Sequence, residues 1–146
     1  MKYTGNDINR LIPQRQPFVM VDTLELSDAD SAATTLVVRN DNYFLLPDGT
    51  MAETGLIEHI AQSCSALAGA RQLSDTGQQA AGNGAPPVGL IGEVKHFECR
   101  RRPQKGEVVH TVVSFGLSFG NVTVATGKCC VGSDTIAEAK LKIFMQ

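Results

Sequence analysis

Residues 51–73, MAETGLIEHIAQSCSALAGARQL, contain no proline and place their apolar side chains at helical spacing. The apolar stripe consists of Leu56, Ile57, Ile60, Ala61, Cys64, Leu67 and Ala68. The opposite stripe, formed by Glu58, Gln62, Ser65 and Gly69, is polar or small. Thr50 and Glu53 fit a capping box, in which a hydroxyl and a carboxylate bind free amides of the first turn. The sequence therefore predicts one long helix that begins near Met51.

On both sides of this helix the pattern is typical of strands. Residues 18–26 and 33–39 are rich in β-forming residues and predict a hairpin, preceded by a short helical turn over 6–11. Four further strands are predicted over 88–99, 107–119, 122–131 and 135–144, separated by turns that contain glycine. The intervening segment 74–87 is rich in Gly, Ala, Gln and Pro and predicts a linker within the domain.

A single apolar helix among many strands predicts an α+β fold in which the sheet covers the helix. No second long helix is predicted that could bury its apolar side chains. We expect residues 1–146 to form one domain, because 146 residues are an ordinary length for one hydrophobic core. Such a sheet leaves its edge strands open, so the pattern also predicts a dimer joined edge to edge.

The composition excludes several classes of protein. Hydrophobic residues make up 42% of the chain and charged residues 19%, as in a soluble globular protein. A net charge of −2 does not favour nucleic-acid binding. The longest apolar runs are shorter than the roughly 20 residues of a membrane span, and no signal sequence begins the chain, so a cytoplasmic location is expected. The four cysteines form no CxxC pair and are predicted to act as small hydrophobic residues, with no metal or cofactor.

Three segments carry a resemblance to a known family. They are residues 11–22, LIPQRQPFVMVD; residues 58–62, EHIAQ; and residues 89–97, GLIGEVKHF, followed by Pro103 and Gly106-Glu107. In this order they resemble motifs of the hotdog-fold 3-hydroxyacyl-(acyl carrier protein) dehydratases. The nearest resemblance is to a divergent branch of predicted dehydratases associated with aryl-polyene and flexirubin-type pigment synthesis. The resemblance implies a hotdog fold, an antiparallel sheet wrapped around one long central helix.

One departure from the family bears directly on the chemistry. Characterised members carry a catalytic histidine in a Gly-His-Phe-Pro loop before the helix, whereas residues 43–50, YFLLPDGT, contain no histidine. The family's glycine that presents a backbone amide to the thioester also lies further ahead of the glutamate than Gly55 does. Half of the usual acid–base pair therefore has no counterpart.

Dehydration of a 3-hydroxyacyl thioester requires a base at C2, an acid for the departing hydroxyl, and a donor to the enolate-like oxygen. The resemblance assigns the carboxyl role to Glu58 and substrate binding to Gly55 and Gln62. His59 is the candidate for the missing imidazole, although neighbouring helical residues point about 100° apart. The alternative is that His59 forms only structural hydrogen bonds. For His96 and His110, on predicted strands, simple packing is expected.

The cluster Arg100-Arg101-Arg102 is the candidate docking site for an acyl carrier protein and its phosphopantetheine arm. The alternative is an ordinary solvated strand end. Three functions stay open: a dehydratase of carrier-bound 3-hydroxyacyl chains, a hotdog thioesterase, and a non-catalytic hotdog subunit that binds acyl chains or completes a heterodimer. For the first, we expect Glu58 and His59 as catalytic residues, no cofactor, and a homodimer or larger oligomer.

Overall fold

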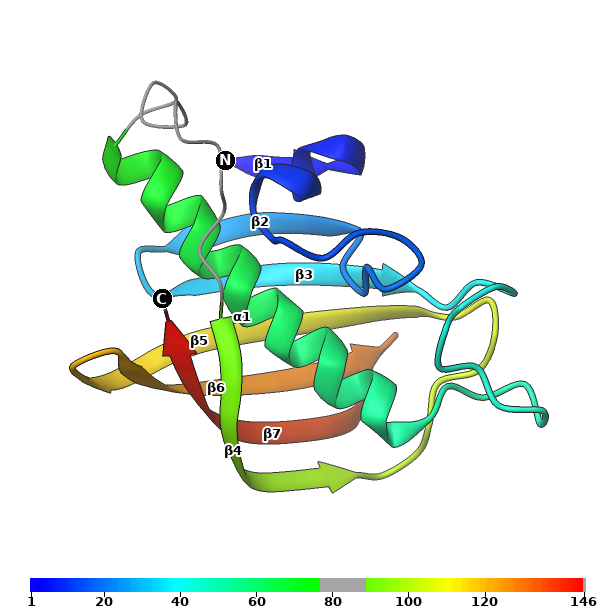
Figure 1. Ribbon diagram of the computed structural model, residues 1–146. Helices are drawn as coiled ribbons and strands as arrows, with labels where there is room; N and C mark the ends of the chain where they lie inside the picture. The colour runs from blue at the N-terminus through cyan, green and yellow to red at the C-terminus, as the bar shows by residue number, and fades with distance from the viewer. Residues whose placement is uncertain (77–88, 146) are drawn as a thin grey trace.

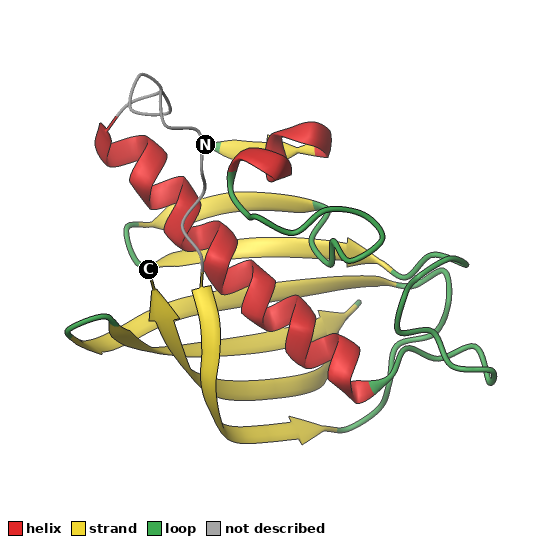
Figure 2. Cartoon of the chain, viewed as in Figure 1, coloured by secondary structure: helices red, strands yellow, loops and turns green. Residues whose placement is uncertain are grey.

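The computed structural model describes residues 1–76 and 89–145. A seven-stranded antiparallel sheet, in the order β1-β2-β3-β5-β6-β7-β4, curves around one long helix (Figures 1 and 2). The strands are β1 Lys2–Thr4, β2 Thr23–Asp28, β3 Ser31–Val37, β4 Gly89–Cys99, β5 Val108–Phe119, β6 Val122–Val131 and β7 Asp134–Met145. The helix α1 spans Glu53–Thr76, and a 3₁₀ helix, η1, spans Gly5–Arg10. The predicted hotdog fold is confirmed, while the assignment of 1–146 to a single domain stays a prediction.

The strands after the helix match the predicted ranges closely, and β6 matches at both ends. The first predicted strand is only partly correct, because β2 begins at Thr23 and residues 18–22 form an irregular segment that we call the strap. The three-residue strand β1 was not predicted, since so short a segment has no readable alternation. Of the predicted linker, residues 74–76 continue α1, and 77–87 lie outside the described residues.

The predicted capping box at the start of α1 is wrong. The Thr50 hydroxyl donates to Asp48 Oδ1 at 2.6 Å and accepts from Arg102 Nε at 2.9 Å. Isolated bridges pair Thr50 with Gln104 and Met51 with Leu45, so both residues are extended. The loop before the helix therefore uses the hydroxyl that the pattern assigned to the cap, and α1 begins at Glu53.

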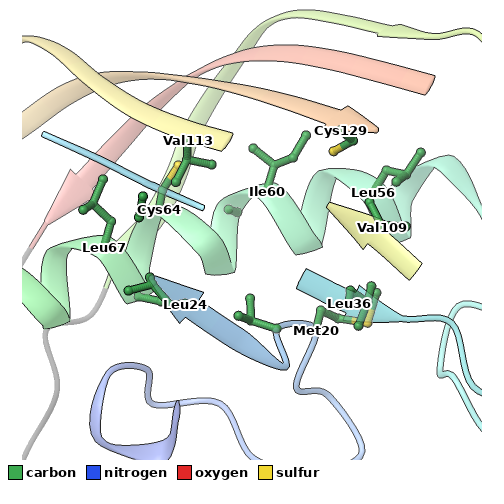
Figure 3. Close-up of a cluster of buried hydrophobic side chains, with 14 of the residues drawn as sticks. Met20, Leu24, Leu36, Leu56, Ile60, Cys64, Leu67, Val109, Val113 and Cys129 are labelled. Carbon is green, nitrogen blue, oxygen red and sulfur yellow. The ribbon is translucent and has the colours of Figure 1, made fainter. Parts of the chain in front are cut away.

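The helix is buried on nearly all sides, which the predicted polar stripe does not anticipate. Leu56, Ile60 and Leu67 are fully buried in the core (Figure 3). On the other stripe, Gln62 is only 1% exposed and Ser65 only 3%. The reason is that the N-terminal segment supplies a second cover of buried residues, Ile8, Leu11, Ile12, Met20 and Val21.

The cysteines behave as small core residues in two of four cases. Cys64 and Cys129 are buried, whereas Cys99 and Cys130 are half-buried, and all four thiols are free. Desolvation raises the pKa of Cys64 to about 12 and that of Cys129 to about 11, which keeps both thiols protonated. None of the helices within 1–76 and 89–145 has the length and apolar character that a membrane span requires.

Candidate functional site

Glu58 lies on the second turn of α1, and its side chain is half-buried. Its carboxylate atom Oε2 accepts a hydrogen bond of 2.7 Å from Nε2 of Gln62, one helical turn further along. The carboxyl group is therefore held against the helix and still reaches solvent.

Gln62 connects the helix to the strap. Its Oε1 accepts a hydrogen bond from the backbone N–H of Met20 at 2.7 Å, and its Nε2 donates to the carbonyl oxygen of Phe18 at 2.8 Å. Phe18 and Met20 belong to the first family motif, and Glu58 and Gln62 to the second. The two motifs thus meet in space across 42 residues of sequence.

His59 is fully buried beside this connection. Its Nδ1 lies 2.6 Å from the Met20 carbonyl oxygen, which can only accept, so Nδ1 carries the hydrogen. Nε2 lies 2.8 Å from the Thr111 hydroxyl, which also lies 3.2 Å from Cys129 Sγ. Desolvation lowers the pKa of His59 to about 4, more than the Met20 carbonyl and the charge of Asp22 raise it. The imidazole is therefore neutral and structurally engaged, as the alternative interpretation has it, and its catalytic role stays a prediction.

Gly55 lies where the helix meets the loop 43–50. Its N–H donates to the carbonyl oxygen of Ala52 at 2.9 Å, and a Cβ at this position would lie 2.7 Å from Cβ of Phe44. Close packing against Phe44 is thus sufficient to require glycine. The predicted contact between Gly55 and the substrate stays a prediction.

Three aromatic side chains near the strap were missed by the sequence interpretation. The rings of Phe18 and Tyr43 lie edge to face at 4.9 Å, and Tyr43 lies 5.3 Å from Phe44. Phe18 is 48% exposed and Tyr43 59%, an unusual exposure for two large rings in contact. Adjacent aromatic residues within a polar turn segment were the available signal.

A cavity of about 490 Å³ lies between the strap, η1 and the end of β3. Ile8, Val19 and Val37 contribute apolar walls, and the ion pair of Asp22 with Arg39, at 3.0 Å, contributes a polar one. Glu58 does not line this cavity. Glu58 is connected to it indirectly, through Gln62 and the backbone of Met20, a residue that lines the cavity.

The arginines of the predicted docking cluster all bind carboxylates of the same chain. Arg100 pairs with Glu98 at 3.1 Å and Glu138 at 3.3 Å, Arg101 with Glu107 at 2.9 Å, and Arg102 with Asp48 at 3.0 Å. The hydrogen bond from Arg101 lowers the pKa of Glu107, so this carboxylate is charged at neutral pH. The structure brings the three arginines together just after the end of β4. Their ion pairs go to Glu98, Glu138, Glu107 and Asp48, whereas Glu58 is bound by Gln62.

The prediction that the other two histidines, His96 and His110, simply pack within the fold is wrong. His96 on β4 and His110 on β5 are exposed and do not pack in the core. On β5 the neighbours of His110, Val109 and Thr111, take the buried face, whereas on β4 residues 91–96 are all exposed. Within the described residues, no group of three or more His, Cys, Asp or Glu side chains could hold a metal ion.

Solved structures with the same fold include both dehydratases and thioesterases. A chain of the dehydratase heterocomplex ApeI:P from Xenorhabdus doucetiae superposes with a TM-score of 0.83 at 16% identity, covering 95% of this chain and 90% of that one. A conserved protein from Pseudomonas aeruginosa gives 0.69 at 14% identity, covering 94% and 98%. A hypothetical thioesterase from Streptococcus pneumoniae, solved with coenzyme A, gives 0.64 at 10% identity, covering 84% of both chains.

At these identities the superpositions show the fold alone. No curated protein sequence matches the chain significantly. The family model of the ApeP dehydratases, by contrast, matches residues 6–146 and so includes both motifs that meet at Glu58 and Gln62. The chain belongs to the ApeP-like dehydratase family.

Proposed function

We propose that this protein removes water from 3-hydroxyacyl thioesters carried on the phosphopantetheine arm of an acyl carrier protein. The observation that carries the proposal is the Glu58 carboxylate, half-buried, held by Gln62 at 2.7 Å, and located in a motif of a dehydratase family. A carboxyl group that is partly shielded but still accessible is suited to proton transfer.

The reaction breaks the C2–H and C3–O bonds and forms a C2=C3 double bond. In the simplest scheme Glu58 accepts the C2 proton and delivers a proton to the leaving hydroxyl, so that water departs and the carboxylate is regenerated. His59 enters this scheme as a fixed neutral imidazole, because both of its nitrogens are already hydrogen-bonded. We propose that a second acid–base group, if the reaction uses one, comes from another subunit.

We further propose that the chain assembles through the edge strand β4 with a second copy or with a related dehydratase subunit. Residues 91–96 of β4 are all exposed, on both faces of the strand, and include Ile91 and Val94. An open edge with apolar side chains is a suitable surface for strand pairing. The heterocomplex found among the similar structures supports a related subunit as one form of this partner.

The arginine cluster is proposed as the carrier-docking surface. Its ion pairs are accessible, since the side chains of Arg100, Arg101 and Arg102 are 54%, 39% and 38% exposed. Exposed pairs of this kind contribute about 0–1 kcal/mol each, so acidic groups of a carrier can compete for them. We expect Arg100→Glu to raise KM for carrier-bound substrate and to leave KM for a free pantetheine thioester unchanged.

The test of the reaction is mass spectrometry of 3-hydroxyacyl carrier substrates, incubated with the protein alone and with its candidate partner subunit. Loss of water supports the proposal. Release of free acid would identify a thioesterase, and an unchanged substrate in both incubations would identify a non-catalytic subunit.

The matched variant is Glu58→Gln, which is nearly isosteric and can still accept the hydrogen bond from Gln62. We expect turnover to fall by about 10²-fold or more while the circular dichroism spectrum and Tm stay close to wild type. Undiminished turnover in the folded variant would exclude Glu58 from the mechanism.

A further inference from the structure

We infer that Gln62 is a positioning residue that fixes the orientation of the Glu58 carboxylate relative to the strap, and that it does not bind substrate. This inference rests on the proposed function of Glu58. It assigns to Gln62 a different role from the substrate contact that the family resemblance implies.

The first argument is the full engagement of the Gln62 amide. A glutamine side chain has two N–H donors and one carbonyl acceptor. One donor binds the Phe18 carbonyl, the other binds Glu58 Oε2, and the acceptor binds the N–H of Met20. With 1% exposure, the side chain has no surface from which to contact a ligand.

The second argument is the rigidity of the strap to which Gln62 is bound. Two residues of α1 bind the backbone of Met20. Gln62 Oε1 accepts from its N–H at 2.7 Å, and His59 Nδ1 donates to its carbonyl oxygen at 2.6 Å. Met20 itself is 1% exposed, so this peptide segment is anchored within the core. The donor that reaches Glu58 is therefore fixed to both the helix and the strap.

The third argument is the different environment of Glu58. Its side chain is half-buried, so packing leaves it room to change rotamer, and the bond from Gln62 at 2.7 Å selects one orientation. A misplacement of about 1 Å in a reacting group can lower a rate by as much as 10²-fold. Loss of the Gln62 amide should therefore affect the chemical step more than the binding of substrate.

The test compares Gln62→Met, which keeps length and removes all three hydrogen bonds, with Ser63→Ala. Ser63 is the matched control because it is buried on the same helix and bonds Thr34 at 2.8 Å, with no bond to Glu58 or the strap. We expect Gln62→Met to lower kcat by about 10-fold to 10²-fold with KM within about twofold, and Ser63→Ala to change neither by more than about twofold. Should Gln62→Met not fold, Gln62→Asn retains an amide that is too short to reach all three partners.

A second readout needs no turnover. Carbon-13 relaxation of the Glu58 side-chain methylene groups should show one ordered rotamer in the wild type and in Ser63→Ala, and rotamer averaging in the Gln62 variants. If the wild type does not dehydrate any substrate, the proposed function fails, yet this measurement still decides whether Gln62 orients Glu58. An increase in KM with unchanged kcat, or an equally ordered Glu58 in the Gln62 variants, would overturn the inference.

Discussion

At the scale of single residues, Glu58 and His59 are adjacent in the sequence and enter opposite environments. Side chains of consecutive helical residues point about 100° apart. On α1 this rotation leaves Glu58 half-buried, bound to Gln62, and places His59 in the core between the strap and β5. A motif that suggests a catalytic pair thus contains one accessible carboxylate and one enclosed imidazole.

The burial of His59 predicts a dependence of stability on pH. The folded chain lowers the pKa of His59 to about 4 from the ordinary 6.5, so between these values the unfolded chain binds more protons. Stability is complete above about pH 6.5 and falls as the pH decreases toward 4, by about 3 kcal/mol from this residue. Denaturant titrations of wild type and His59→Asn across this range provide the measurement.

The His59→Asn variant is the control because acidic residues such as Asp48 and Glu107, whose pKa values are also lowered, destabilise both proteins at low pH. We expect the variant to be less stable at neutral pH but to lose stability less steeply on acidification. If the wild-type pH–rate profile has a limb near neutral pH, the profile of His59→Asn should have the same limb, because His59 does not titrate there. Equal slopes in the two proteins, or the loss of that limb, would show that His59 titrates in the ordinary range.

At the scale of elements, α1 packs closely because small residues face its neighbours. A Cβ on Gly69 would clash with the Leu11 carbonyl oxygen and lie 2.9 Å from the Leu11 Cα. Across the sheet, a Cβ on Gly127 of β6 would lie 2.6 Å from Cγ2 of Ile60. The two glycines bring the helix into contact with the N-terminal cover on one side and with the sheet on the other.

These contacts predict different costs for the same substitution. Gly69→Ala meets backbone atoms, which cannot rotate away, and we expect a loss of about 2 kcal/mol in the free energy of unfolding, despite the better helix propensity of alanine. Gly127→Ala meets a side-chain methyl, Cγ2 of Ile60, which can move only by rotation about χ1, and should cost about 1 kcal/mol. Urea unfolding curves measure both, with Gly116→Ala as control because its nearest contact would be an ordinary 3.6 Å. A higher free energy of unfolding for Gly69→Ala would mean that the backbone of Leu11 shifts away from α1 without cost.

At the scale of the whole molecule, the sheet has two unequal edges. β1 has 3 residues, whereas β4 has 11, and within residues 1–76 and 89–145 β4 pairs only with β7. Six consecutive residues of β4, 91–96, are exposed, so this edge of the sheet is open to solvent. We expect a partner strand on this edge.

Assembly through β4 can be tested with a charge on the edge. Val94 is 39% exposed, and Val94→Lys should convert the oligomer to a monomer of 15.6 kDa in sedimentation velocity, because pairing would bury the ammonium group. The control is Val112→Lys, the same change at a 53% exposed position inside the sheet. A monomeric wild type, or an unaffected Val94→Lys oligomer, would contradict the prediction.

Local sequence patterns were sufficient for the helix, for the four strands after it, and for the position of Glu58. Periodicity of 3.6 or 2 residues follows from backbone geometry and can be read within a short window. The hotdog arrangement followed from a resemblance in three motifs, whereas the order of the strands in the sheet was not predicted and comes from the structure. Local patterns misplaced the helix start, because the Thr50 hydroxyl binds Asp48 and Arg102 instead of a helical amide.

What only the tertiary structure decided is the state of each polar group in the candidate site. Gln62 is on the predicted polar stripe, and it is buried because Met20, 42 positions earlier, binds it. His59 is neutral because burial desolvates it, between hydrogen-bond partners 39 and 52 positions away. Arg100 binds Glu138, 38 positions away, and Arg102 binds Asp48, 54 positions away. The sequence by itself determined the long helix, the four strands after it, and the place of Glu58 on that helix. Burial and hydrogen bonding depend on contacts between distant segments, which exist only once the chain has folded.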